Sequence, residues 1–272
     1  MRNYTRFSLR YLMAGILFLC LFFAWVAEQV KESQRQYEIA TEIHALDGFV
    51  TWNEGYFTRI GKVYLNQKKE GVDSVLEQLA TCPELRELSL ESSQFDEESL
   101  KHIAGLTKLE VLNLKWTSVT DKGLRHIAGL HNLRELKLMK TQLSTKRENV
   151  SSDQLTNAGL KHLKGLTSLE KLIIWGADID DDGLVHLKNM DKLSVLWLTD
   201  TNIEGPGLAT LAKLKSLKKL DLSGTKVSGE SLAALEGMPT LESLTIVRTK
   251  VKKEEAFAFL HKMAGPTKSI GY

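Results

Sequence analysis

Leucines recur at fixed intervals over most of this chain. The pattern L-x-x-L-x-L occurs seven times, with isoleucine in the last position twice, starting at Leu85, Leu109, Leu133, Leu169, Leu193, Leu217 and Leu241. Successive starts are 24 residues apart, except for 36 residues between Leu133 and Leu169. A single supersecondary unit is therefore repeated, with a 12-residue insertion in the third unit.

Within each unit, the apolar residues are first spaced two residues apart and then three residues apart. Leu112 and Leu114 alternate with other residues, as in a short strand, whereas Leu124, Ile127 and Leu130 recur every three residues, as on one face of a helix. A strand and helix of this size cannot bury both apolar faces alone, so neighbouring units must stack. The pattern predicts an α/β solenoid, with a curved parallel sheet on the concave face and helices on the convex face.

This pattern and period resemble the leucine-rich repeat. The unit Leu109–Asn132 resembles the 24-residue class, and Leu79–Leu90, which contains Cys82, is similar to the cysteine-containing subtype of F-box adaptor proteins. No F-box precedes the repeats, so the resemblance does not imply an adaptor role. It covers roughly residues 36–262 and implies a fold much more strongly than a function.

The same spacing extends the array upstream of Leu85. Leu76, Leu79 and Cys82 lie 24 residues before Leu100, Ile103 and Leu106. Cys82 thus takes the place of a core leucine and is expected to be a buried, unreactive thiol. With a strand supplied by Ile60, Val63 and Leu65, one residue out of register, the array is predicted over residues 59–262, followed by a C-terminal tail at 263–272.

Residues 28–58 are expected to shield the first repeat. Val30–Leu46 has the spacing of an amphipathic helix, which Gly48 would end. A strand at Phe49–Trp52 and a turn at Asn53–Gly55 follow. We interpret this segment as a juxtamembrane helix and N-terminal cap.

A hydroxyl residue follows most of the predicted strands, where many such repeats place asparagine. Threonine occupies this position at 117, 141, 201, 225 and 249, with Ser93 and Ala177 as departures. We expect a ladder of hydroxyl groups that turns the chain, interrupted at Ala177.

The segment Tyr11–Ala27 has 17 residues and no charge, enough for a helix of roughly 25 Å, at the short end of what spans a bilayer. Three arginines precede it within residues 1–10, whereas the residues just after it carry balanced charge. The positive-inside rule then predicts a signal anchor at residues 11–27, with a cytoplasmic N-terminus and an extracytoplasmic array. An arginine-flanked anchor before such an array resembles membrane-anchored bacterial leucine-rich-repeat proteins.

Cleaved and buried alternatives to this anchor remain open. A signal peptide also has a basic start and an apolar stretch, but the candidate exits at Ala24 and Ala27 place Phe22 and Trp25 where a small residue is needed. Cys20 lacks the small residue expected before a lipidated cysteine. A buried core helix is disfavoured because the segment is apolar all round.

Charge and cysteine content exclude several function classes. The net charge is +2, and the arginines of residues 1–10 supply +3, so the rest of the chain sums to about −1. A domain that binds nucleic acid would show a basic stripe, so no nucleic-acid partner is expected. With 43% hydrophobic residues and two cysteines, the chain can bury a core but cannot form a disulfide-rich scaffold or a four-cysteine zinc site.

The concave face carries the candidate binding site. By strand alternation, side chains with an aromatic centre and a basic rim should point outward there. The predicted residues are Val111, Lys115, Met139, Lys171, Ile173, Trp175, Val195 and Trp197, with Lys137 beside them. An exposed aromatic cluster with a polar rim is typical of a binding hot spot; the alternative is that these residues form cross-strand ladders that serve stability alone.

Two sets of potential metal ligands have simpler interpretations. Asp178, Asp180, Asp182 and Gly183 match the opening of a calcium loop, but the twelfth position is Asn189 instead of glutamate. Asp180 aligns with a helix N-cap of another repeat, so capping is the preferred role. The repeated histidines are expected to be surface residues, at positions 102, 126, 162 and 186. No metal site or cofactor is predicted.

The 12-residue insertion, about residues 144–155, is polar and aperiodic and should form a loop beside the concave patch; it can serve recognition or be a tolerated insertion.

No P-loop, G-x-S-x-G or H-E-x-x-H motif is present, so no enzymatic activity is expected. The sequence favours a membrane-anchored leucine-rich-repeat protein that binds a protein or another polymer on its concave face. The alternatives are a self-assembling envelope protein and an unrecognised enzyme.

Overall fold

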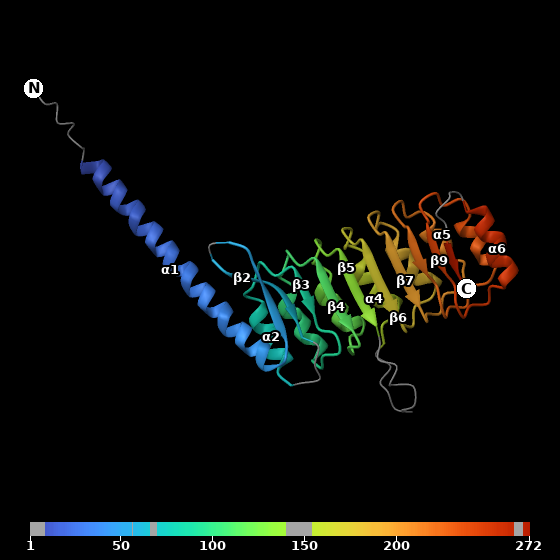
Figure 1. The fold of residues 1–272 in the computed structure, drawn as a ribbon, viewed down its shortest axis with the longest axis horizontal. Helices are drawn as coiled ribbons and strands as arrows, with labels where there is room; N and C mark the ends of the chain where they lie inside the picture. The colour runs from blue at the N-terminus through green and yellow to red at the C-terminus, as the bar shows by residue number, and fades with distance from the viewer. Residues whose placement is uncertain (1–8, 56, 66–69, 140–153, 264–268) are drawn as a thin grey trace, which may run out of the picture.

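The computed structural model describes residues 9–55, 57–65, 70–139, 154–263 and 269–272. Over these residues the chain forms a sheet of ten strands that follow one another in sequence order. Figure 1 shows the strands side by side along the long axis, with helices covering the other face of the sheet. The predicted α/β solenoid is confirmed.

Strand register follows the leucine pattern. β1 (Phe49–Asn53) pairs antiparallel with β2 (Arg59–Tyr64), and every later pairing is parallel. The parallel strands that follow are β3 (Glu87–Ser89), β4 (Val111–Lys115), β5 (Glu135–Met139), β6 (Lys171–Trp175), β7 (Val195–Thr199), β8 (Lys219–Asp221), β9 (Ser243–Thr245) and β10 (Ser269–Gly271). Leu112 pairs with Leu136, which pairs with Leu172, so equivalent leucines lie side by side. The 36-residue spacing therefore leaves the sheet register unchanged.

Short helices connect the parallel strands. They are α2 (Val72–Leu79), η1 (Glu97–Ile103), α3 (Asp121–Leu124), η2 (Arg125–Ile127), α4 (Asn157–Leu163), η4 (Asp181–Leu187), α5 (Leu208–Leu211), η5 (Glu230–Leu235) and α6 (Lys253–Lys262). Several are 3₁₀ helices, whose three-residue turn matches the three-residue spacing of their apolar positions. Leu124, Ile127 and Leu130 are all fully buried, as that spacing predicts.

One continuous core fills the space between the sheet and the helices. The leucines of every repeat motif are buried in it, and Cys82 takes its place among them with no exposed surface. Burial raises the pKa of the Cys82 thiol to about 11. The expectation of a buried thiol at a leucine position is confirmed.

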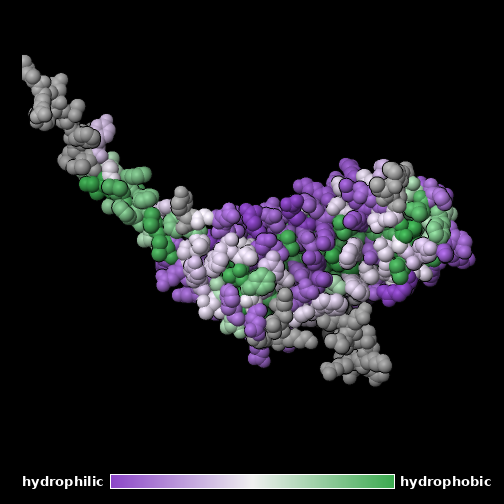
Figure 2. Space-filling model, in the orientation of Figure 1, coloured by the Kyte–Doolittle hydropathy of each residue, from purple (hydrophilic) through white to green (hydrophobic). Residues whose placement is uncertain are grey.

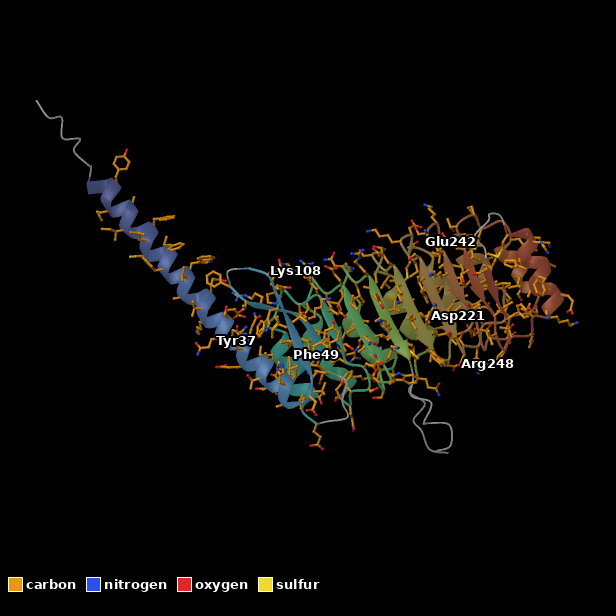
Figure 3. The ribbon with its side chains drawn as sticks, viewed as in Figure 1. Tyr37, Phe49, Lys108, Asp221, Glu242 and Arg248 are labelled. Carbon is orange, nitrogen blue, oxygen red and sulfur yellow. The ribbon has the colours of Figure 1, made fainter. Side chains whose placement is uncertain are left out.

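The N-terminal cap differs from the expected arrangement in one respect. A single helix, α1 (Leu9–Ala45), replaces the anchor followed by a separate amphipathic helix. Ile39 and Ile43 of α1 are buried in the core, so its C-terminal part closes the first end of the array. The β1–β2 hairpin completes this cap, where the ring of Phe49, which Figure 3 labels, stacks on that of Tyr64 with the centroids 4.4 Å apart.

The opposite end of the array also extends beyond the predicted boundary. Residues 263–272 were expected to be a tail, but β10 lies within them and pairs in parallel with β9. Ile270 lies opposite Leu244 and packs against the core. An added strand of this kind satisfies backbone groups of β9 that would otherwise be unpaired at the end of the sheet.

A turn of the same geometry follows β4, β7, β8 and β9. The threonine hydroxyl donates to the carbonyl three residues earlier, as Thr117 does to Leu114 at 2.7 Å and Thr201 to Leu198 at 2.8 Å, and Thr225 and Thr249 do the same. These four hydroxyls thus close turns inside their own repeats, instead of forming the expected ladder between repeats. Ser93 is different because its hydroxyl donates to the carbonyl of Leu65 in the preceding repeat. Thr141 lies outside the described residues.

Candidate functional site on the concave face

The predicted patch occupies adjacent strands, β4 to β7. Sheet register arranges it in three rows, one with Val111, Lys171 and Val195, one with Lys137, Ile173 and Trp197, and one with Lys115, Met139 and Trp175. Figure 3 labels Asp221 of β8, which continues the middle row beyond Trp197. The predicted residues therefore lie on one face of four neighbouring strands, with Glu135 between Val111 and Lys171.

Exposure of these side chains varies more than the alternation pattern suggested. Trp197 is 39% exposed, whereas Met139 and Ile173, which were expected to project outward, are only 7% and 4% exposed. Both belong to the concave face, where Trp197 is the register partner of Ile173 and Trp175 that of Met139. Trp197 is thus the exposed aromatic residue of the predicted patch, and Trp175 is half-buried.

Trp116 joins this patch from a turn, and the strand pattern did not identify it. It follows β4, and its ring centroid lies 6.0 Å from that of Trp175 at an angle of 53°. Its backbone N–H donates to the Met139 carbonyl at 2.7 Å. Trp116 and Trp175 thus flank Met139, which pairs with Trp175 on one side and with Lys115, the residue before Trp116, on the other.

The backbone of Trp116 is left-handed, with φ of 60°. This conformation recurs at the equivalent turn position of other repeats, at Ser92, Gly176, Asp200, Gly224 and Arg248. Glycine is the residue best suited to it, and a bulky side chain is an outlier there. The 24-residue alignment, which sets Trp116 opposite two glycines, is the signal that could have identified it.

Two more turn residues complete the site. The Trp175 indole N–H donates to Asp200 Oδ2 at 2.6 Å, and Arg248 Nη2 donates to Asp200 Oδ1 at 2.9 Å. Asp200 and Arg248 are 48 residues apart, and Gly224 takes the equivalent turn position between them. A Cβ on Gly224 would collide with the Asp200 carboxylate. Glycine at this turn therefore leaves room for the carboxylate to reach Arg248.

The lysines of the patch are engaged in ion pairs. Lys137 and Lys171 lie 2.7 Å and 3.1 Å from the Glu135 carboxylate, and Lys115 lies 3.8 Å from that of Glu91. Burial alone would raise the pKa of Glu135, but the hydrogen bonds and positive charges of Lys137 and Lys171 outweigh it and lower that pKa. The positive charges of the expected basic rim are thus largely paired with carboxylates.

Two acidic side chains that match the opening of a calcium loop are hydrogen-bonded to other residues of the protein. Asp180 accepts from the Asp182 N–H at 3.0 Å, as an N-cap of η4, and from Asn157 Nδ2 at 2.6 Å. The hydrogen bond from Asn157 is the main cause of a lowered Asp180 pKa. Asp178 accepts from Asn202 Nδ2 at 2.6 Å. Within the part of the chain that the structure describes, no three His, Cys, Asp or Glu side chains are grouped to hold a metal ion.

A second polar feature follows the opposite edge of the sheet, where the strands begin. Arg134 pairs with Glu170 at 2.8 Å, Lys108 with Glu84 at 2.6 Å, and Arg86 with Glu110. An open pocket of about 580 Å³ lies among these side chains. Figure 2 shows hydrophilic surface along this edge. These pairs link successive repeats, so their evident role is to hold the repeats in register.

The insertion at residues 144–155 lies mostly outside the described residues. Only Gln154 and Leu155 are described, and the Leu155 carbonyl accepts from the Asp178 N–H at 2.9 Å. Met139, the last described residue before the gap, belongs to the patch. The loop that was expected beside the patch therefore falls outside the described residues.

Comparisons with known proteins agree with the fold. A family model described as "Leucine Rich repeat" matches residues 105–128 and 213–235. The fold is similar to that of internalin C2 from Listeria monocytogenes, with 21% identity, 78% of this chain and 80% of that chain covered, and a TM-score of 0.55. A second internalin of that organism covers 69% of this chain and 68% of its own at 19% identity, with a TM-score of 0.41. A search among curated proteins gives no match. The repeat pattern, the ten-stranded sheet, the family-model match and the similarity to internalin C2 support a leucine-rich-repeat protein.

Proposed function

We propose that this protein is a single-pass membrane-anchored binding module, with its N-terminus in the cytoplasm and its array outside. Support comes from α1, the helix among the described residues that is long and apolar enough to cross a membrane, since an 18-residue stretch of it has a mean hydropathy of 1.9. None of this apolar stretch is buried within the protein. Leu17, Phe18 and Phe23 are each more than half exposed. Such an apolar surface is costly in water and suited to a bilayer.

The ligand is a protein, bound at the concave face. The observation that carries this proposal is the group of tryptophans on the concave face, in which Trp197 is exposed and Trp116 and Trp175 are half-buried with their ring centroids 6.0 Å apart. Tryptophan and arginine are the residue types most enriched in interface hot spots, and Arg248 lies at the edge of this cluster. Aromatic side chains that are already held in place lose little entropy when a partner binds.

Affinity capture from detergent-solubilised membranes tests the site. The variants are Trp175→Ala with Trp197→Ala, and the matched control is Phe257→Ala, which removes an exposed aromatic side chain of α6 far from the patch. The double variant should reduce recovery of specific partners about tenfold or more, since hot-spot truncations cost at least ~2 kcal/mol, whereas the control should retain them. Equal recovery by all three proteins would refute the assigned site.

Self-assembly through the array ends is the second candidate function. It is favoured by β10, which ends the sheet, and by the exposed rings of Phe257 and Tyr272 beside it, 5.3 Å apart. An unpaired edge strand is a template for another chain. Cross-linking in membranes that yields self-oligomers, lost on Phe257→Ala but unchanged by Trp197→Ala, would favour this function over ligand binding.

A further inference from the structure

The junction between α1 and the array is rigid. Gln36 of α1 is 1% exposed, and its Oε1 accepts from the backbone N–H of Ile60 at 2.7 Å. Arg59 of β2 donates from Nη2 to Gln29 Oε1 at 2.6 Å and from Nη1 to Ser33 Oγ at 2.8 Å. Polar contacts between helix and hairpin therefore continue to Gln29, two residues beyond the end of the apolar segment at Ala27.

An aromatic pair extends this contact into the apolar segment itself. The rings of Trp25 in α1 and Phe57 at the tip of the β1–β2 hairpin meet edge to face, with centroids 5.6 Å apart and planes at 88°. Trp25 precedes Ala27 by two residues, which is about 3 Å along the helix axis. The hairpin tip therefore reaches the level at which the proposed membrane span ends.

Residue chemistry changes at this level. Trp25 is 52% exposed, like the apolar side chains before it. The pocket beside Trp25 and Phe57 is lined otherwise by polar residues, namely Gln29, Asn53, Glu54, Arg59 and Glu84. An aromatic ring between an apolar stretch and charged groups is the arrangement that membrane–water interfaces favour.

We propose that the tip of the β1–β2 hairpin is a second membrane contact, in which Phe57 together with Trp25 enters the interfacial layer of the leaflet from which α1 emerges. This inference rests on the proposed membrane span of α1. The occupant is the boundary between lipid headgroups and acyl chains, because the contact surface is continuous with the exposed apolar surface of α1. The hairpin tip then gives the array a second point of contact with the membrane, beside α1.

This second contact fixes the orientation of the binding face relative to the membrane. α1 runs without a break from Leu9 to Ala45 and packs Ile39 and Ile43 into the core, so no flexible linker separates the span from the first repeat. Figure 1 shows the array running obliquely away from the axis of α1. With the helix and the hairpin tip both engaged, the array cannot rotate freely about the helix axis relative to the membrane.

Spin labelling of the full chain in phosphatidylcholine–phosphatidylglycerol vesicles tests this inference. In a Cys20→Ala background, nitroxides are attached at Phe57→Cys, at Phe18→Cys within the apolar segment, and at Lys215→Cys, whose side chain is 79% exposed on the array. Power saturation compares collisions with oxygen, which enters lipid, and with a water-soluble nickel chelate. We expect an oxygen-to-nickel ratio at position 57 several-fold above that at position 215 and below that at position 18.

The outcomes separate the two proposals. A ratio at position 57 equal to that at position 215, with position 18 deep in lipid, would overturn the hairpin contact and leave the anchor standing. An oxygen-to-nickel ratio at position 18 as low as that at position 215 would overturn both the hairpin contact and the membrane span. A label at Glu54→Cys keeps the Phe57 ring in place, and the oxygen-to-nickel ratio there should lie between those at positions 57 and 215. Ratios as low as that at position 215 at both tip positions, 54 and 57, would overturn the hairpin contact.

Discussion

The indole of Trp175 donates a 2.6 Å hydrogen bond to Asp200, whose carboxylate also accepts from Arg248. One carboxylate thus positions an aromatic ring of the candidate site and connects it to Arg248, in a turn two repeats beyond Asp200. The Arg248 side chain is 63% exposed and that of Asp200 is 25% exposed.

This relationship predicts unequal effects of removing the two charged partners. Arg248→Ala should lower the free energy of unfolding by at most about 1 kcal/mol, because exposed ion pairs contribute little. Asp200→Ala should cost about 1.5 kcal/mol or more, since it also leaves the Trp175 N–H without its acceptor. Denaturant unfolding of the detergent-solubilised protein measures both. Equal losses would mean that the indole hydrogen bond contributes nothing measurable.

Trp116 combines an unfavourable backbone with a useful ring. Trp116→Ala and Trp116→Gly both remove the ring contact with Trp175, but only glycine adopts a φ of 60° without strain. The glycine variant should therefore be more stable than the alanine variant by about 1 kcal/mol. Both variants should bind ligand equally weakly, if the ring serves recognition. Thermal melts and capture assays on the pair test this, and an alanine variant of equal or higher stability would contradict the strain.

Gly224 is required by space as well as by conformation. Its φ is 69°, and an added Cβ would collide with the Asp200 carboxylate. Gly224→Ala should destabilise the protein by about 1–3 kcal/mol. Gly129→Ala is the matched control, because a Cβ there would meet no atom within 4 Å. Unfolding of the control should shift little, and a similar loss in both variants would remove the special role of Gly224.

Cys82 should be inert in the folded protein. It has no exposed surface, and burial raises its pKa from 9.0 to about 11. Iodoacetamide at pH 8 should therefore leave Cys82 unmodified in a Cys20→Ala protein until denaturant is added, as mass spectrometry can show. Because the folded pKa is the higher one, the unfolded state loses its proton first as pH rises above 9, so this group should lower stability between pH 9 and 11. Rapid native labelling would contradict the burial.

Calcium should have no effect on stability. Asp178 and Asp180 are engaged by Asn202 and Asn157, and Asp180 also caps η4. Ligands that bind only the folded state raise Tm, so the Tm should be the same in millimolar calcium and in chelator. An increase in Tm that Asp180→Asn abolishes would restore the calcium interpretation.

Much of the fold could be predicted because the contacts within one repeat recur in every other. Leu112 pairs with Leu136, and both are fully buried, as their positions in the motif predict. In a solenoid each unit contacts only its neighbours, so a short sequence pattern already describes the tertiary contacts. The array boundaries were less predictable, because β10 pairs through its backbone and needs no leucine motif.

The candidate site was predicted only in part. Trp175 and Trp197 follow from strand alternation, whereas Trp116, Asp200 and Arg248 lie in turns that alternation does not describe. Arg248 reaches Asp200 across 48 residues of sequence. Side-chain contacts of this length depend on how repeats stack in space, and no local pattern records them.

The sequence by itself determined the repeat unit, the strand register, the burial of the leucines and of Cys82, and the apolar segment at the N-terminus, because all of these follow from periodicity and hydrophobicity. Only the tertiary structure decided that α1 is a single helix bonded to Arg59, that the hairpin tip meets Trp25, and that the ring of Trp116 lies 6.0 Å from that of Trp175. The physical reason is that polar pairing and aromatic contact depend on distances between side chains, and those distances are set only when the repeats have stacked.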